Sequence, residues 1–116
     1  MPNSKIALLV LSVILVTSYL TLAIYSGLPK SLSKLEIETA VNQASHLYKQ
    51  EKAKGRDFSD GPCLSDALLP DWVVDIVHKP RIPTDDLPEN QCPGYLQGRS
   101  KHFVELDLLG NVIRVK

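Results

Sequence analysis

Hydrophobic residues run almost without interruption from Ile6 to Tyr25, and the run holds no charged residue. About 20 apolar residues, at 1.5 Å of helix rise per residue, match the ~30 Å hydrocarbon core of a bilayer. The pattern therefore predicts a transmembrane helix. Polar residues return after it, so we expect an N-terminal tail (1–5), a transmembrane anchor (6–27) and a small soluble domain (28–116).

The same run has a second interpretation, a secretory signal that is cleaved. Lys5 before the run fits the positively charged start of a signal, but the run is longer than the usual apolar region of about 7–15 residues. The best cleavage site follows Ala23, and it would leave Ile24 and Tyr25 near the start of the mature chain. The length of the run favours an uncleaved signal-anchor.

A helical pattern follows, which begins between Ser31 and Ser33 and runs to about Lys54. Ser33 and Glu36 have the spacing of a capping box, and Gly55 is a natural residue at which to end a helix. Apolar residues recur every three or four positions, which predicts one apolar face that packs on a core. These residues are Ile37, Ala40, Val41, Ala44, Leu47 and Tyr48.

Three segments in the second half of the chain carry strand signals. Residues 72–78 are rich in β-branched side chains, and residues 102–107 and 112–115 form a hairpin pattern around Gly110. Residues 63–69, before Pro70, predict one short helical turn. The predicted fold class is α+β: an N-terminal transmembrane helix, then an amphipathic helix packed on a small antiparallel sheet of about three strands. The expected core residues are Trp72, Val74, Ile76, Val104, Leu106 and Ile113.

Residues 79–98 form a Pro- and Gly-rich segment, and a loop this long is usually functional or covalently pinned. Cys63 and Cys92 have no CxxC partners, so we predict one disulfide between them in an oxidising compartment. It would stabilise the domain by roughly 3–4 kcal/mol. The alternative is two reduced cysteines in a cytoplasmic domain. Lysines on both sides of the apolar run leave its orientation open, so the disulfide is what predicts an extracytoplasmic domain.

One acidic group in this loop is a candidate ligand site. Asp85, Asp86 and Glu89 offer carboxylate oxygens of the kind that bind calcium, although their spacing is not that of an EF-hand. The alternative is a set of solvated turn residues. Three further carboxylates, Asp75, Glu105 and Asp107, are expected on the solvent face of the sheet, because strands alternate apolar and polar positions.

Composition and motifs narrow the function classes. The chain has 13 basic and 13 acidic residues and no basic stripe, which argues against nucleic-acid binding. HExxH, GxSxG and Gly-rich phosphate motifs are absent from the sequence, so we expect neither an enzyme nor a bound cofactor. The expected partners are the lipid bilayer and other membrane or envelope proteins.

The layout of an apolar helix, an amphipathic helix and a disulfide-closed β-meander resembles that of type IV pilins and pseudopilins. The resemblance implies assembly through the apolar helix after cleavage by a prepilin peptidase. The processing motif differs here, since Lys5-Ile6 replaces the usual Gly and aromatic start, and no Glu follows five residues on. The sequence therefore predicts a single-pass protein of the cell membrane with a structural or protein-interaction role, and a pilin-like or pseudopilin-like subunit is the alternative.

Overall fold

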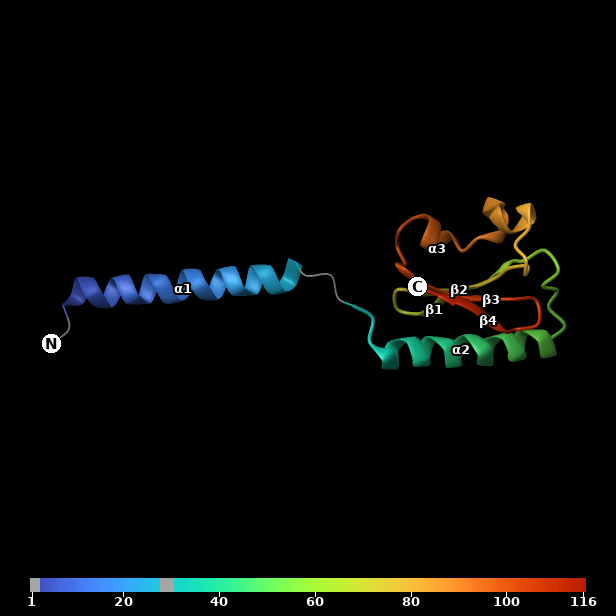
Figure 1. Ribbon diagram of the computed structural model, residues 1–116, viewed down its shortest axis with the longest axis horizontal. Coiled ribbons are helices and arrows are strands. Elements are labelled where there is room, and N and C mark those ends of the chain that lie inside the picture. Colours follow the sequence, from blue (N-terminus) through green and yellow to red (C-terminus); the bar gives the residue numbers. More distant parts are fainter. Residues whose placement is uncertain (1–2, 28–30) are drawn as a thin grey trace. The chain divides into compact units, whose positions relative to one another are not determined.

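The computed structural model describes residues 3–27 and 31–116, which belong to two compact units, 1–31 and 32–116 (Figure 1). Among its described residues, the first unit contains a single helix, α1 (Ser4–Gly27). The second contains every other element. Residues 1–2 of the predicted tail and residues 28–30, where the soluble domain was predicted to begin, lie outside the described residues.

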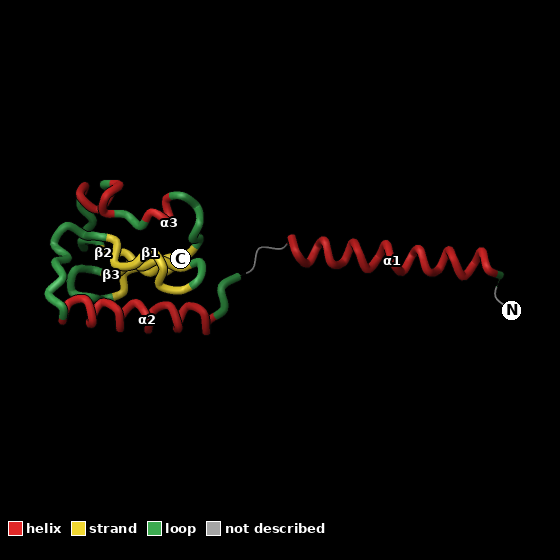
Figure 2. Tube along the Cα trace, turned by 180° about the vertical axis from the view of Figure 1, so that it is seen from behind, coloured by secondary structure: helices red, strands yellow, loops and turns green. Residues whose placement is uncertain are grey.

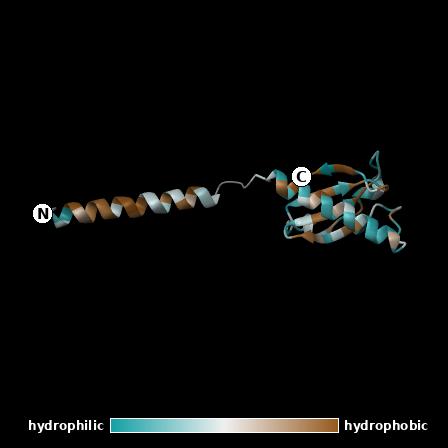
Figure 3. Cartoon of the chain, turned by 90° about the horizontal axis from the view of Figure 1, so that it is seen from below, coloured by the Kyte–Doolittle hydropathy of each residue, from teal (hydrophilic) through white to brown (hydrophobic). Residues whose placement is uncertain are grey.

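Helix α1 is apolar along most of its length, and none of its residues is buried (Figure 3). It is the one helix in the described parts of the chain that is long and apolar enough to cross a membrane. Its hydroxyl groups bond back to its own carbonyls: Ser12 Oγ donates to Leu9 O at 2.8 Å and Thr21 Oγ1 to Thr17 O at 2.7 Å. Polar side chains paired within the helix in this way are compatible with a hydrocarbon environment.

Helix α2 (Lys34–Ala53) begins with the predicted capping box. Ser33 Oγ accepts from the Glu36 N–H at 3.1 Å, and the Glu36 carboxylate accepts from the Ser33 N–H at 3.0 Å. Ala40, Ala44 and Tyr48 are buried on its inner face, as the apolar spacing predicted. The two alanines are small, so the helix backbone can pack close to the sheet.

The sheet has four strands in the order of the sequence: β1 (Cys63–Leu69), β2 (Trp72–Ile76), β3 (His102–Leu106) and β4 (Val112–Val115). Figure 2 shows the strands in yellow, with α2 along one side of them. The β1–β2 and β3–β4 pairs are antiparallel, whereas β2 and β3 are parallel. A parallel pair requires a long crossover, and residues 77–101 supply it. This crossover carries two 3-10 turns, η1 (Pro83–Asp86) and η2 (Pro88–Asn90), and the short helix α3 (Pro93–Leu96).

The α+β class is therefore confirmed, with two corrections to the sheet. It is mixed and four-stranded rather than antiparallel with about three strands, and residues 63–69 are a strand rather than a helical turn. Strand β1 pairs with β2 through two register shifts, which break the regular alternation that would have marked it as a strand. Pairing with a neighbour, rather than local sequence preference, decides its structure.

One face of the sheet packs on α2. Five of the six expected core residues are buried there, and the sixth is not. The buried ones are Trp72, Val74, Ile76, Val104 and Leu106. Ile113 is only half-buried, because the register moves from Glu105–Arg114 to Leu106–Val112 and leaves Ile113 as the extra residue of a bulge.

The opposite face of the sheet lies under the crossover (Figure 1). Val73, Phe103 and Cys92 form a second small core there, with Tyr95 of α3 packed edge-on to Phe103 at 5.0 Å between ring centroids. The sheet is thus the middle layer of three. Polar residues of this face were predicted to meet solvent, and instead they meet the crossover.

The β3–β4 turn is attached to α2 through Tyr48. The Tyr48 hydroxyl donates to Leu108 O at 2.7 Å, and its ring lies beneath Gly110, which has φ of +87°. A Cβ at Gly110 would lie 2.5 Å from two ring atoms of Tyr48. The turn therefore requires glycine both for backbone conformation and for space.

We predict that Gly110→Ala destabilises the domain more than Gly55→Ala does. Both positions have positive φ, but a Cβ at Gly55 meets no atom within 4 Å. Gly55→Ala should cost about 1 kcal/mol from backbone strain alone, and Gly110→Ala about 1–3 kcal/mol more from the contact with Tyr48. Urea unfolding of the full chain in detergent, followed by the fluorescence of the single tryptophan, measures both. Equal losses at the two positions would contradict the packing of Tyr48 under the turn.

Candidate functional site

A cavity of about 90 Å³ lies between the sheet and the crossover. Its lining combines apolar and charged side chains from β2, β3, β4 and the crossover. They are Val73, Asp75, Arg81, Gln91, Cys92, Tyr95, Phe103, Glu105 and Arg114. The volume is sufficient for a few water molecules or one small polar group.

Strand register places three of the charged residues in one row across the sheet. Asp75 of β2 is the partner of Glu105 on β3, and Glu105 is the partner of Arg114 on β4. Two carboxylates directly opposite on neighbouring strands repel each other when both are ionised. The row therefore needs either cations or a proton to be stable.

Two arginines neutralise Glu105, which is only 7 % exposed. Its Oε2 lies 3.2 Å from Arg81 Nη1 and 3.2 Å from Arg114 Nη2. Arg81 also pairs with Asp86 at 2.9 Å, and the Arg114 guanidinium lies over the Phe103 ring at 4.8 Å. Each arginine thus connects the buried Glu105 to the rim of the cavity.

Asp75 has no such partner. Burial, together with the negative charge of Glu105, raises the pKa of Asp75 to about 8. Its Oδ1 is out of contact with solvent and accepts no hydrogen bond from any group in the part of the chain that the structure describes. At neutral pH Asp75 therefore keeps a proton, which removes the repulsion with Glu105.

The prediction that Asp75 and Glu105 lie on a solvent face is wrong. Alternation correctly placed them on the side opposite Val74 and Val104, but the crossover covers that side. The crossover's path depends on β2 and β3 being parallel, and no local pattern in the sequence indicates this. The one signal available was the disulfide, which connects the loop to the strand beside Asp75.

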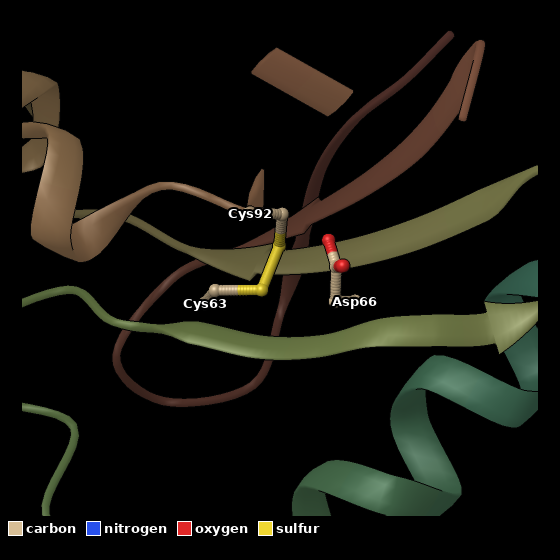
Figure 4. A group of neighbouring side chains, drawn as sticks. All are labelled: Cys63, Asp66 and Cys92. Carbon is tan, nitrogen blue, oxygen red and sulfur yellow. A yellow bond between two sulfur atoms is a disulfide. The ribbon is translucent and has the colours of Figure 1, made fainter. Parts of the chain in front are cut away.

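The predicted disulfide is present and forms one wall of this region. Cys63 and Cys92 are joined with 4.9 Å between their Cα atoms (Figure 4). Asp66 lies beside the two sulfur atoms, and its Oδ1 accepts from the Gly94 N–H at 2.6 Å. Because both sulfurs are bonded to each other, they are not available as thiolate ligands, and this trio is not a metal centre.

Asp85, from the predicted ligand loop, is completely buried. Its carboxylate accepts from the N–H groups of His78 and Ile82 at 3.2 and 2.9 Å, and it lies 2.8 Å from His78 Nδ1. Burial alone would raise the pKa of Asp85, but the hydrogen bonds from Ile82 and His78 lower it below its ordinary value. Asp85 therefore organises the start of the crossover.

The other two acids of that loop point elsewhere. Asp86 pairs with Arg81, and Glu89 is exposed. Among the described residues, the three carboxylates do not form a cluster whose oxygens lie within 4.8 Å of one another. Calcium binding at this loop is thus an untested prediction, and the structure does not bring its three expected ligands together.

No protein-family model, curated protein or solved structure matches the chain. The chemistry of the cavity is therefore the starting point for proposing a function. Its lining can bind a small polar group, and Asp75 can hold or release a proton near neutral pH. Its polar groups are carboxylates, guanidinium groups, an amide and a phenol, a set suited to binding.

We predict that Asp75 makes stability fall as pH rises. Its pKa is about 8 in the folded protein and near 3.8 when unfolded, so its contribution is fully present below pH 4 and is lost as pH rises through 8. The slope reaches at most about 1.4 kcal/mol per pH unit. Asp75→Asn should remove this slope in urea unfolding between pH 5 and 8.

Glu89→Gln is the matched control, because it removes one exposed carboxylate from the crossover. It should keep the pH dependence of the unmodified chain. The role of Asp75 would be refuted by an unchanged slope in Asp75→Asn.

We also predict that reduction of the disulfide loosens the crossover first. Its prolines lack N–H donors, and the covalent link closes a segment with a sequence separation of 29. Reduction should cost roughly 3–4 kcal/mol and speed amide exchange in residues 79–98, while the 102–115 hairpin stays protected longest. Hydrogen exchange read by mass spectrometry, before and after reduction, tests the order. Simultaneous loss of protection in both segments would contradict it.

Proposed function

We propose that the chain is a single-pass membrane protein whose disulfide-closed domain lies outside the cytoplasm and has a structural or protein-interaction role. The observation that carries the proposal is the contrast between the two units. Helix α1 has no buried residue, whereas the unit 32–116 contains two buried clusters of its own.

The membrane anchor is supported by the absence of buried residues in α1. A core helix of a water-soluble protein would bury an apolar face, and α1 buries none. Its apolar side chains surround the helix on all sides, so in water they would be an aggregation hazard. A bilayer removes that cost, and the length of the helix suits one crossing.

The compartment is supported by the disulfide. Disulfides persist mainly in oxidising compartments, and this one connects β1 to a crossover made of short helical turns rather than strands. Free-thiol labelling of unreduced protein from native membranes should find no accessible thiol. Two labelled cysteines would contradict both the link and the extracytoplasmic location.

The interaction role is supported by the cavity. Arg81, Glu105 and Arg114 of its lining pair with one another across the crossover, β3 and β4, and no lining residue is a serine, threonine or histidine. Such a lining, with a few placed polar groups beside apolar and aromatic side chains, favours recognition of a small ligand. We therefore infer a domain that is held near the membrane and binds a partner there.

A pilin-like subunit is the alternative, favoured by the order of an apolar helix, an amphipathic helix and a disulfide-closed sheet. Two features differ from the layout on which that resemblance rests. Helices α1 and α2 have separate boundaries, Gly27 and Lys34, and the parallel β2–β3 pair means that the sheet is not a meander.

We predict that the full chain, with an intact Met1 or Pro2 terminus, stays in the membrane fraction after carbonate extraction and dissolves in detergent. Leu15→Arg should weaken retention, because an arginine at the centre of a spanning helix costs about 2.5–3.5 kcal/mol on insertion scales. Leu109→Arg, which changes an exposed leucine of the soluble unit, should not. Intact-mass measurement of the purified protein gives the terminus.

The same mass separates the alternatives. A chain shortened near Ala23 and found in the soluble fraction would identify a signal peptide. A cut at the start of the apolar run would identify pilin-type processing. Either result would refute the anchor as proposed.

A further inference from the structure

The charges around the cavity do not balance when Asp75 is ionised. Glu105 and Asp86 are paired with Arg81 and Arg114, and Asp75 adds one further negative charge. Asp85, which lies within electrostatic range of Asp75, adds to the negative field. An ionised Asp75, opposite Glu105 on the next strand and within electrostatic range of Asp85, is therefore stabilised by a positive charge beside it, and a proton is the simplest occupant.

The shape of the site favours a larger cation than a proton. The cavity is about 90 Å³ in volume, and its apolar wall is formed by Val73, Tyr95 and Phe103. Aromatic rings attract cations through their π faces, and Phe103 already carries the Arg114 guanidinium at 4.8 Å. A cation with a short alkyl chain would satisfy both the carboxylate and this wall.

We propose that the cavity binds a primary alkylammonium group, with Asp75 as its counter-ion. The N–H donors of the ammonium would bond to Asp75 Oδ1, which no described group of the protein satisfies. The alkyl chain would contact Tyr95 and Phe103. On binding, Asp75 gives up its proton to solvent, and the ammonium takes over the neutralising role.

Other small ligands fit less well. A divalent metal ion needs about six oxygen ligands, and Glu105, one of the two carboxylates of the lining, is already paired with both arginines. An anion would have to compete with Glu105 for the same two arginines, in a cavity that already contains two carboxyl groups. An alkylammonium ion needs only one carboxylate and an apolar wall.

This inference makes the proposed interaction role more specific, because it names the chemical class of the ligand. It rests on that role, because the binding partner is what would carry the amine. The source of the amine is either a lysine side chain of a partner or a free amine. The binding test below measures ligand binding in the cavity alone. A failed binding test would leave the membrane anchor unaffected, and a failed anchor test would leave ligand binding unaffected.

The experiment is a titration of the full chain in detergent micelles with n-butylammonium chloride, read by NMR at Val73, Tyr95 and Phe103. Sodium chloride at equal ionic strength and n-butanol are the matched ligand controls. We expect saturable shifts with n-butylammonium only. Affinity should rise about tenfold per pH unit between pH 5 and 7, because the ligand competes with a proton. Nα-acetyl-lysine amide tests the side-chain source: binding as tight as that of n-butylammonium supports a partner lysine, and loss of binding supports a free amine.

Asp75→Asn should weaken binding at least about tenfold and remove its pH dependence, since the counter-ion is gone. Glu89→Gln removes the same charge from the exposed part of the crossover and should bind like the unmodified chain. The proposal is overturned if n-butylammonium gives no saturable shift, if n-butanol or sodium chloride reproduces the shifts, or if Asp75→Asn binds as before. Because the first two outcomes need only the unmodified chain, the proposal stays testable even if a variant does not fold.

Discussion

The disulfide between Cys63 and Cys92 is the constraint on which the second face of the sheet depends. The crossover contains several prolines, so it cannot build a ladder of backbone hydrogen bonds over the sheet. The covalent link attaches it to β1, and Asp66 reinforces the attachment through the Gly94 N–H. Once the crossover lies there, Val73 and Phe103 gain an apolar cover, and a one-sided sheet becomes the middle layer of three.

Covering that face has an electrostatic consequence. In an open sheet, Asp75 and Glu105 would be solvated, and water would screen their repulsion. Under the crossover they lie opposite each other in a partly buried row, so Glu105 requires Arg81 and Arg114, and Asp75 requires a proton or another cation. The residues that shape the cavity are therefore also those that set its charge. A fold held by one covalent link thus creates a site whose chemistry depends on the protonation of one residue.

Local signals in the sequence predicted the elements that local physics controls. The apolar run, the capping box of Ser33 and Glu36, the α2 face of Ala40 and Ala44, and the 102–115 hairpin all follow from periodicity, capping and turn chemistry. The pairing of Cys63 with Cys92 followed from there being two cysteines. Strand β1 was missed because its two register shifts break the alternation, and Ile113 because a bulge turned it out of the core.

The sequence by itself determined that the chain has one apolar helix, an amphipathic helix, a strand near residues 72–78 and a hairpin at 102–115, and it predicted one disulfide. Only the tertiary structure decided that β2 and β3 are parallel and that Asp75, Arg81, Glu105 and Arg114 surround one cavity. The physical reason is the range of the interactions. Helix caps and hairpin turns are local, whereas the direction of a strand pair and the cover on a sheet face depend on where a crossover of some 25 residues returns. That return depends on contacts between residues far apart in the chain.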